Sequence, residues 1–209
     1  LLQPDFGSAL VLLAISVGMV LLARVPRRYI FSGLIGVVIV STLAWSFFLQ
    51  GYQKDRIRSV FDPERDPFGS GYNIRQSVIA VGAGGMWGRG LGEGSQSQLR
   101  FLPEAQTDFI FAVLAEQLGF FIVLLILAAY AIMGWRIIRI CYSSSDGFAL
   151  FCAAGFFIAI SVQVILNVGM NLGILPIVGL PLPFVSLGGS AILSNFLMMA
   201  VVQSIRVRG

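Results

Sequence analysis

One carboxylate in this sequence stands where it could carry out proton chemistry. Asp108 ends a long polar stretch and directly precedes an apolar segment that begins at Phe109. Thr107 and Asp108 are residue types that favour helix amino termini, where their oxygens accept hydrogen bonds from unpaired backbone NH groups. A carboxylate at the edge of a low-dielectric region can also act as a general base. Asp108 is therefore open to two interpretations, a helix cap and a catalytic base, which can coexist.

A second acidic residue, Glu116, lies in the apolar segment that follows Asp108. In a continuous helix it would lie two turns further along the axis, about 12 Å deeper in the membrane. An ionisable group at that depth costs free energy and is functional by default. The alternative for Glu116 is a buried ion pair or a capped polar contact.

A basic cluster of Lys54, Arg56 and Arg58 follows the second apolar segment. These side chains could extend to lipid headgroups or pair with Asp55. They could instead bind an anionic ligand at the membrane surface, such as a pyrophosphate carried on a lipid. Further basic residues of the same loop could contribute to such a site: Arg75, Arg89 and Arg100.

Seven glycines between positions 82 and 94 superficially resemble a phosphate-binding loop. Such loops need a preceding buried strand and a following helix whose amino terminus holds the phosphate. This run instead follows a segment with helical apolar spacing. We therefore expect a tight backbone path between packed elements in preference to anion binding.

The elements that must position these residues are membrane helices. Of the 209 residues, 57% are apolar and 11% are charged, which excludes an ordinary soluble domain. We expect an all-α, polytopic integral membrane protein whose five spans cover residues 6–23, 29–49, 109–135, 148–166 and 190–205. Histidine is absent and the two cysteines lack metal-ligand spacing, so zinc sites, Ser-His catalysis and disulfide scaffolds are excluded, and we expect no metal ligands in the protein.

Arginine placement predicts how the chain crosses the membrane. Seven arginines follow the first, third and fifth spans: Arg24, Arg27, Arg28, Arg136, Arg139, Arg206 and Arg208. By the positive-inside rule these turns face the cytoplasm. The loop from residue 50 to 108 and the uncharged connection from 167 to 189 are then extracytoplasmic, and Asp108 lies at the outer surface.

Two parts of the outer surface have predicted structure. The segment from Tyr72 to Val81 has helical apolar spacing, which predicts a short interfacial helix within the 50–108 loop. The stretch from Gly169 to Gly189 is rich in proline and glycine, too broken for a helix and too apolar for open water. It predicts a re-entrant loop, either a structural plug or a wall for substrate. Polar groups would come from Asn167, Asn171, Ser186 and Ser190.

Several strings in the sequence resemble the SEDS family, the RodA and FtsW proteins, in the order and at the spacing of that family. They are QPDFGSA, YQKDRIRSVFDPERDPFGSGYN, QSVIAVGAGG, GRGLGEGSQSQL, FLPEAQTDFIFAVLAEQLGF and GILPIVGLPLPFVSLGGSA. The GSQSQL and DPERDP strings resemble the RodA branch, which serves elongation, more than the FtsW branch, which serves division. Since family members have about ten spans and this chain starts without methionine, residues 1–209 resemble the carboxyl-terminal half of one SEDS membrane domain.

The resemblance implies a peptidoglycan glycosyltransferase that polymerises lipid II at the outer face of the bacterial cytoplasmic membrane, releasing undecaprenyl diphosphate. It implies that Asp108 is the catalytic base, which takes a proton from the acceptor sugar hydroxyl. The residues expected to contact substrate are Lys54, Arg56, Arg75, Glu104, Thr107, Glu116, Ser186 and Ser190. A divalent cation, Mg²⁺ or Mn²⁺, is an alternative source of charge for the leaving diphosphate. The implied partners are a class B penicillin-binding transpeptidase and other elongation or division proteins, and no nucleic acid.

Two other classes of function stay open. A flippase for lipid-linked precursors needs a polar path through the bilayer, but Glu116 is the only ionisable residue expected inside it. A scaffold for cell-wall synthesis proteins needs neither a poised carboxylate nor a basic cluster. An assay of glycan polymerisation separates the scaffold from the enzyme.

Overall fold

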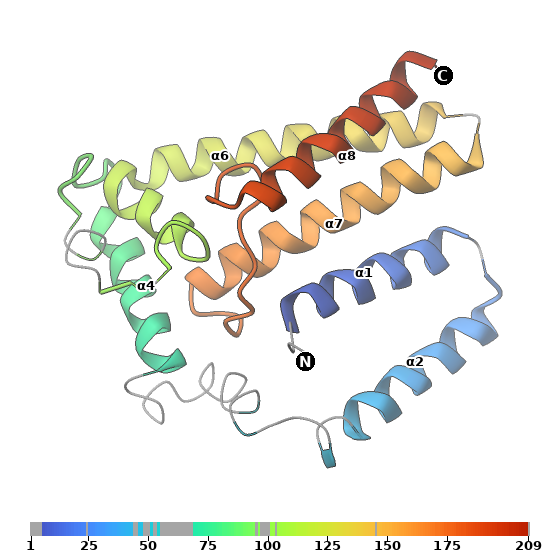
Figure 1. Ribbon diagram of the computed structural model, residues 1–209, viewed down its shortest axis with the longest axis horizontal. Coiled ribbons are helices and arrows are strands. Elements are labelled where there is room, and N and C mark those ends of the chain that lie inside the picture. The colour runs from blue at the N-terminus through green and yellow to red at the C-terminus, as the bar shows by residue number, and fades with distance from the viewer. Residues whose placement is uncertain are drawn as a thin grey trace.

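The computed structural model is all-helical over the residues that it describes, which are 6–23, 25–43, 46–47, 51, 54, 69–94, 96, 101–102, 104–144 and 146–208. Among them there are helices and turns but no strand. In chain order the helices are α1 (Phe6–Leu22), α2 (Arg27–Leu43), α4 (Ser70–Gly84), α6 (Ile110–Ser143), α7 (Gly147–Asn171) and α8 (Gly189–Arg208) (Figure 1). The predicted all-α fold is confirmed.

Among the described residues, three helices are long and apolar enough to cross a membrane: α6, α7 and α8. Helices α1 and α2 have 17 residues each and are apolar but shorter. Helix occurs over each of the five predicted spans, and α7 continues beyond the predicted end at Leu166 to Asn171. The predicted polytopic membrane architecture is confirmed.

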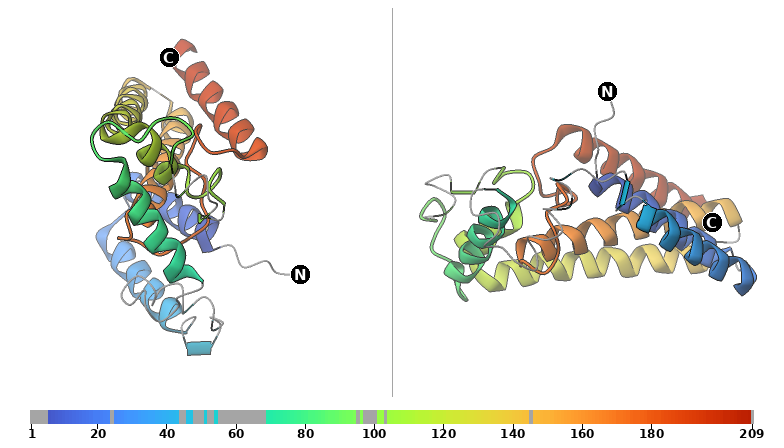
Figure 2. Two further views of the ribbon diagram at one scale, coloured as in Figure 1. Left: turned by 90° about the vertical axis from the view of Figure 1, so that its left-hand side faces the viewer. Right: turned by 90° about the horizontal axis from the view of Figure 1, so that it is seen from below.

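Helices α1, α2, α6, α7 and α8 run along a roughly common direction, and α4 lies across one end of the bundle (Figures 1 and 2). Helices α6 and α7 are antiparallel neighbours, and α1 packs against α7. Glycines allow the α1–α7 approach, since a Cβ at Gly18 would lie 2.4 Å from Ile158 and one at Gly155 would lie 2.5 Å from Met19. A core of Ile137, Ile140, Ala153, Phe156, Ile160 and Val202 joins α6, α7 and α8.

One end of the bundle, here called the arginine end, gathers basic residues. The carboxyl ends of α1, α6 and α8 and the amino ends of α2 and α7 meet there (Figure 1). Exposed arginines are present at these helix ends: Arg28, Arg136, Arg139 and Arg206. The bundle thus brings together arginines that the sequence assigned to one side. The assignment of this end to the cytoplasm rests on the positive-inside rule.

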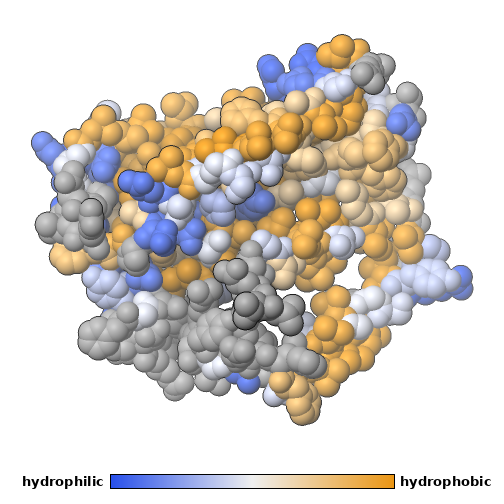
Figure 3. Space-filling model, in the orientation of Figure 1, coloured by the Kyte–Doolittle hydropathy of each residue, from blue (hydrophilic) through white to orange (hydrophobic). Residues whose placement is uncertain are grey.

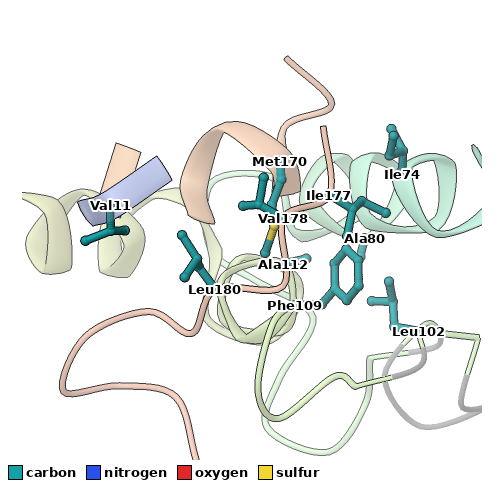
Figure 4. Close-up of a cluster of buried hydrophobic side chains, with 10 residues drawn as sticks. All are labelled: Val11, Ile74, Ala80, Leu102, Phe109, Ala112, Met170, Ile177, Val178 and Leu180. Carbon is teal, nitrogen blue, oxygen red and sulfur yellow. The ribbon is translucent and has the colours of Figure 1, made fainter. Parts of the chain in front are cut away.

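The opposite end, here called the loop end, contains α4, the turn 104–109 and the connection 172–188 (Figure 1). The predicted helix at 72–81 is present within α4, which packs against α6 and α7. Figure 4 shows the apolar core that holds these parts together. Its members come from α1, α4, α6 and α7, from the residues just before α6 and from the 172–188 connection: Val11, Ile74, Ala80, Leu102, Phe109, Ala112, Met170, Ile177, Val178 and Leu180.

Helix α6 is broken near its start, which corrects the prediction of a continuous span from 109 to 135. Gly119 has φ 78° and ψ −178°, so a helix of residues 110–118 meets a longer helix of residues 120–143 at a kink. Only glycine adopts this backbone conformation readily. The longer part also runs past Trp135 to Ser143.

Candidate active site

Asp108 lies in a tight turn at the loop end. The carbonyl of Glu104 accepts hydrogen bonds from the NH groups of Thr107 and Asp108 at 3.1 Å and of Phe109 at 3.3 Å. Thr107 Oγ1 also donates to the carbonyl and carboxylate oxygens of Glu104, at 3.2 and 3.1 Å. The N-cap position of α6 belongs to Phe109. Neither Thr107 nor Asp108 therefore holds the position that the helix-cap interpretation assigned to them.

Two buried asparagines of α7 hold the backbone of Asp108. Asn167 and Asn171 each donate from Nδ2 to the Asp108 carbonyl oxygen, at 3.0 and 3.1 Å. Both side chains are 0% exposed. They are four residues apart in one helix, so they project from the same face. We call Asn167 and Asn171 the asparagine pair.

Further bonds connect the asparagine pair to the neighbouring elements. Asn171 Oδ1 accepts from the Ala112 NH at 3.2 Å, in the first turn of α6. Ser77 of α4 donates to the Asn171 carbonyl at 2.8 Å and lies 3.2 Å from Asn171 Oδ1. Asn167 Nδ2 also donates to the Leu180 carbonyl at 2.7 Å. Helices α4, α6 and α7 and the 172–188 connection thus share one buried polar network.

The 172–188 connection binds the Asp108 turn from the other side. Ser186 Oγ donates to the Thr107 carbonyl at 2.6 Å and accepts from the Leu182 NH at 2.7 Å. The Leu187 NH donates to the Gln106 carbonyl at 3.0 Å. Ser186 is 2% exposed, so its hydroxyl acts as a structural bridge between the two segments.

The carboxylate of Asp108 lies beside a glycine of the same connection. Gly179 has φ 68°, and a Cβ built there would lie 3.6 Å from Asp108 Oδ2. Asp108 is half-buried and Gly179 is exposed. The backbone of Asp108 is fixed on two sides while its carboxylate stays partly accessible, which is the preorganisation that a general base requires.

The glycine run at 82–94 packs against the kink of α6. A Cβ at Gly84 would lie 1.8 Å from the Ala115 carbonyl oxygen, and one at Gly88 would lie 2.3 Å from the Gln117 carbonyl oxygen. The Phe120 NH donates to the Gly85 carbonyl at 3.0 Å across the break. The predicted tight backbone path is confirmed, because only residues without a side chain permit this approach.

Glu116 belongs to the short part of α6, before the break at Gly119, so its predicted depth stays a prediction. It is 0% exposed, and its Oε1 accepts from the Gln96 NH at 2.9 Å. The Arg89 NH donates to the Glu116 carbonyl at 3.0 Å. The carbonyl and the carboxylate of Glu116 therefore bind the backbone at Arg89 and Gln96, respectively. The structure supports the alternative of a capped polar contact for Glu116.

The other predicted site residues are dispersed. Arg75 is half-buried on α4, Glu104 is exposed in the Asp108 turn, and Ser190 is exposed in the first turn of α8. In the described part of the chain, the network around Asp108 includes Thr107 and Ser186 but not Ser190. Lys54 is half-buried, with neighbours on both sides that are not described. Arg56, Arg58 and Arg100 lie outside the described residues.

A divalent cation finds no ready donor set among the described residues. They include no group of three or more His, Cys, Asp or Glu side chains that could hold a metal ion. Mg²⁺ prefers carboxylate oxygens together with substrate phosphates. Because one or two carboxylates together with substrate phosphates are enough to hold Mg²⁺, a divalent cation stays a prediction, and the chemistry below uses none.

The sequence pointed to Asp108 but did not assign the asparagine pair, Ser77 and Gly179 to its support. One signal for the pair was available, since two amides at i and i+4 in an apolar helix must find buried partners. Nothing in the sequence linked Ser77 to Asn171, because they are far apart in the chain and meet only through packing of α4 on α7.

Comparisons with known proteins agree with the resemblance seen in the sequence. The chain matches the family model FTSW_RODA_SPOVE, described as Cell cycle protein, over residues 1–208. It is 41% identical over 203 residues to the Peptidoglycan glycosyltransferase MrdB of Escherichia coli K12, covering 97% of this chain and 55% of that protein. It is 41% identical over 208 residues to the Probable peptidoglycan glycosyltransferase FtsW of Legionella pneumophila, covering 98% and 52%. It is 41% identical over 200 residues to Stage V sporulation protein E of Bacillus subtilis, covering 95% and 53%.

A solved structure is also similar, with a TM-score of 0.76 and 32% identity over 96% of this chain and 55% of that one. It is described as "Structural coordination of polymerization and crosslinking by a peptidoglycan synthase complex". The chain spans about half the length of these relatives. Equal identity to the three named relatives does not separate the branches, so the RodA-branch interpretation stays a prediction. The match over nearly the whole sequence shows that the chain belongs to the FtsW/RodA/SpoVE family of cell cycle proteins.

Proposed function

We propose that this chain carries the general base of a peptidoglycan glycosyltransferase that polymerises lipid II. One observation carries the proposal: Asp108 is a half-buried carboxylate whose backbone is held by two fully buried asparagines. The names of the relatives support the reaction class, since two of those described above are peptidoglycan glycosyltransferases.

The proposed reaction needs one base and one leaving group. The hydroxyl oxygen of the acceptor sugar attacks the anomeric carbon of the donor, and Asp108 takes the hydroxyl proton. The bond from that carbon to the lipid diphosphate breaks, and the diphosphate leaves with the electron pair. Attack opposite the leaving group converts an α-linked diphosphate into a β-glycosidic bond without a covalent enzyme intermediate.

Positive charge near the diphosphate lowers the barrier, because charge develops on the leaving oxygens. We assign this role to Lys54 and Arg56, whose position after α2 favours contact with a lipid-borne anion. Arg75 on α4 is a further source of charge at the loop end. Arg89 is less suited, because its Nε donates to the Ala83 carbonyl at 3.1 Å.

The environment of the proposed site suits a lipid-linked substrate. Figure 3 shows hydrophobic side chains over much of the helical face, with hydrophilic groups gathered toward the two ends. By the positive-inside rule, the loop end faces away from the cytoplasm. We propose that the protein works at the outer face of the cytoplasmic membrane, with the polyprenyl tail of the substrate beside the helices.

We also propose a class B penicillin-binding transpeptidase as partner. The similar solved structure is a peptidoglycan synthase complex described as coordinating polymerization and crosslinking. A partner that crosslinks strands has to receive the polymer close to where it is made, which supports docking at the loop end.

The flippase alternative is weaker than the sequence suggested. The described charged residues of α6 beyond Gly119, of α7 and of α8 are confined to the arginine end. A path of polar groups across the bilayer therefore has no support in these helices. The scaffold alternative is separated from the enzyme by the experiment that follows.

The test is Asp108→Asn in the full-length protein, which keeps the shape of the side chain but removes its basicity. We expect the rate of polymerisation of labelled lipid II to fall by at least about 10²-fold. The matched control is Asp146→Asn at the arginine end, where Asp146 accepts from the NH groups of Phe148 and Ala149 at 3.3 Å. Asparagine is an equally good N-cap, so this variant should polymerise normally. Normal polymer from Asp108→Asn would reject the general-base assignment.

A further inference from the structure

A pocket at the arginine end is lined by three arginines. It has a volume of about 540 Å³ and lies between α6 and α8. Arg136 and Arg139 line it from α6, and Arg206 lines it from the last turn of α8. The other lining residues are Trp135, Ile140, Ser143 and Gln203. No acidic side chain is among these described lining residues, so an anion would relieve the repulsion among three like charges.

An apolar groove adjoins this basic pocket. It has a volume of about 340 Å³ and lies between the same two helices. The groove and the pocket share Arg136, Ile140 and Gln203 as lining residues. The other groove residues are apolar and lie further from the arginine end along both helices: Ala129, Ile132, Met133, Ile137, Met199 and Val202. The basic pocket therefore continues into the apolar groove, which runs along α6 and α8 toward the middle of the bundle.

The side chains of the pocket suit a phosphate ester at a membrane surface. Arg139 lies over the Trp135 ring, with its guanidinium carbon 4.8 Å from the ring centroid. This stacking fixes the plane of a group whose NH donors match phosphate geometry. Tryptophan itself is enriched at the boundary between hydrocarbon and headgroups. Within the described residues, helix α8 buries little of its surface.

We propose that the α6–α8 cleft binds an anionic phospholipid of the leaflet at the arginine end. Its phosphate headgroup lies among Arg136, Arg139 and Arg206, and one acyl chain follows the apolar groove. The site is separate from the proposed catalytic site, because it lies at the opposite end of the bundle. The competing explanation is that these arginines only set the orientation of the chain in the membrane or favour the carboxyl ends of helices.

Binding is measured on the full-length protein in detergent by native mass spectrometry, with three probes. The probes are phosphatidylglycerol, phosphatidylethanolamine with the same acyl chains, and glycerol 3-phosphate without chains. We expect phosphatidylglycerol to bind at least about tenfold more tightly than either of the other two. Equal binding of the two lipids would overturn the headgroup assignment. Equal binding of glycerol 3-phosphate would overturn the lipid assignment in favour of a plain phosphate site.

Variants test the two parts of the cleft separately. The double variant Arg139→Gln/Arg206→Gln should weaken phosphatidylglycerol binding by at least about tenfold. Arg28→Gln is its control, since Arg28 is at the same end but does not line the pocket. If the double variant fails to fold, Arg139→Lys/Arg206→Lys keeps the charges and should still weaken binding, because lysine lacks the planar fork. Wild-type affinity in the double variant that folds would overturn the proposal.

For the groove, Ala129→Trp places a large side chain at an exposed lining position. Ala128→Trp adds the same bulk at the adjacent exposed position, which does not line the groove. We expect Ala129→Trp to weaken phosphatidylglycerol binding and Ala128→Trp to leave it unchanged. Equal effects of the two substitutions would show that no acyl chain occupies the groove and would overturn that part of the proposal.

Discussion

Replacing Asn171 by alanine tests whether the asparagine pair positions the proposed base. The substitution removes the bond from Nδ2 to the Asp108 carbonyl and a second bond at 2.8 Å to the Asn167 carbonyl. It also removes the acceptor that the Ala112 NH and the Ser77 hydroxyl approach at 3.2 Å. Asn171 is fully buried, so water does not replace these partners without opening the structure.

The expected loss of stability follows from these contacts. Interhelical hydrogen bonds in membrane proteins contribute about 0.6 kcal/mol each, and a buried partner left unsatisfied costs about 1 to 3 kcal/mol. Five side-chain contacts are lost, and the buried Ala112 NH loses its partner, whereas the Asp108 carbonyl keeps Asn167. Together these losses predict a destabilisation of about 2 to 4 kcal/mol. A displacement of Asp108 by about 1 Å is enough to lower catalysis by roughly 10²-fold.

Two measurements on Asn171→Ala in the full-length protein check this reasoning. Thermal unfolding in detergent reports stability, and the initial rate of lipid II polymerisation at a temperature where the variant is folded reports positioning. Asn195→Ala in α8 is the control, since Asn195 is a half-buried asparagine outside the network. A variant with unchanged melting temperature and a polymerisation rate within about twofold of wild type would refute the positioning role.

Three further outcomes are expected. Gly119→Ala should destabilise the protein by more than about 3 kcal/mol in thermal unfolding, because φ is 78° and a Cβ would lie 2.3 Å from the Gly88 nitrogen. Its control is Gly36→Ala inside α2, where a Cβ meets nothing within 4 Å, so this variant should not destabilise the protein. Lys54→Ala should lower kcat/KM for lipid II by roughly tenfold to a hundredfold, whereas Lys54→Arg should stay close to wild type. If the alanine and arginine variants had equal kcat/KM, Lys54 would not bind the diphosphate. Cysteine placed at Gly69 should be labelled from outside intact cells and cysteine at Arg139 should not, and the reverse pattern would show that the predicted orientation is wrong.

The sequence predicted the membrane helices because their signal is strong and local. Long apolar segments and one-sided arginines appear directly in composition and order, and α7 and α8 lie where the hydropathy placed them. The helix α4 was also predictable, since the apolar spacing of its residues is periodic. The tight path of the glycine run followed from the absence of the strand that a phosphate loop needs.

The break in α6 was not predicted, because a single glycine in an apolar segment is common and does not by itself indicate a kink. Gly119 leaves helical geometry where the glycine run packs against it, as the close approach of Gly88 shows. The depth assigned to Glu116 stays a prediction, because the break at Gly119 lies beyond it. The asparagine pair around Asp108 depends on contacts between distant segments, which one sequence does not reveal.

The asparagine pair lies in the last turn and a half of α7, which begins at Gly147 and ends at Asn171. Both amides donate hydrogen bonds to the Asp108 carbonyl from one helix face, so the position of the asparagine pair along α7 sets the position of the proposed base. Inserting one residue in the middle of α7 would turn its two ends by about 100° relative to each other and shift them by about 1.5 Å. If the rest of α7 stayed packed on α1 and α6, both amides would rotate away from Asp108 together. The length of this helix is therefore a constraint on the proposed catalysis, and we expect substitutions along it to be tolerated far better than insertions or deletions.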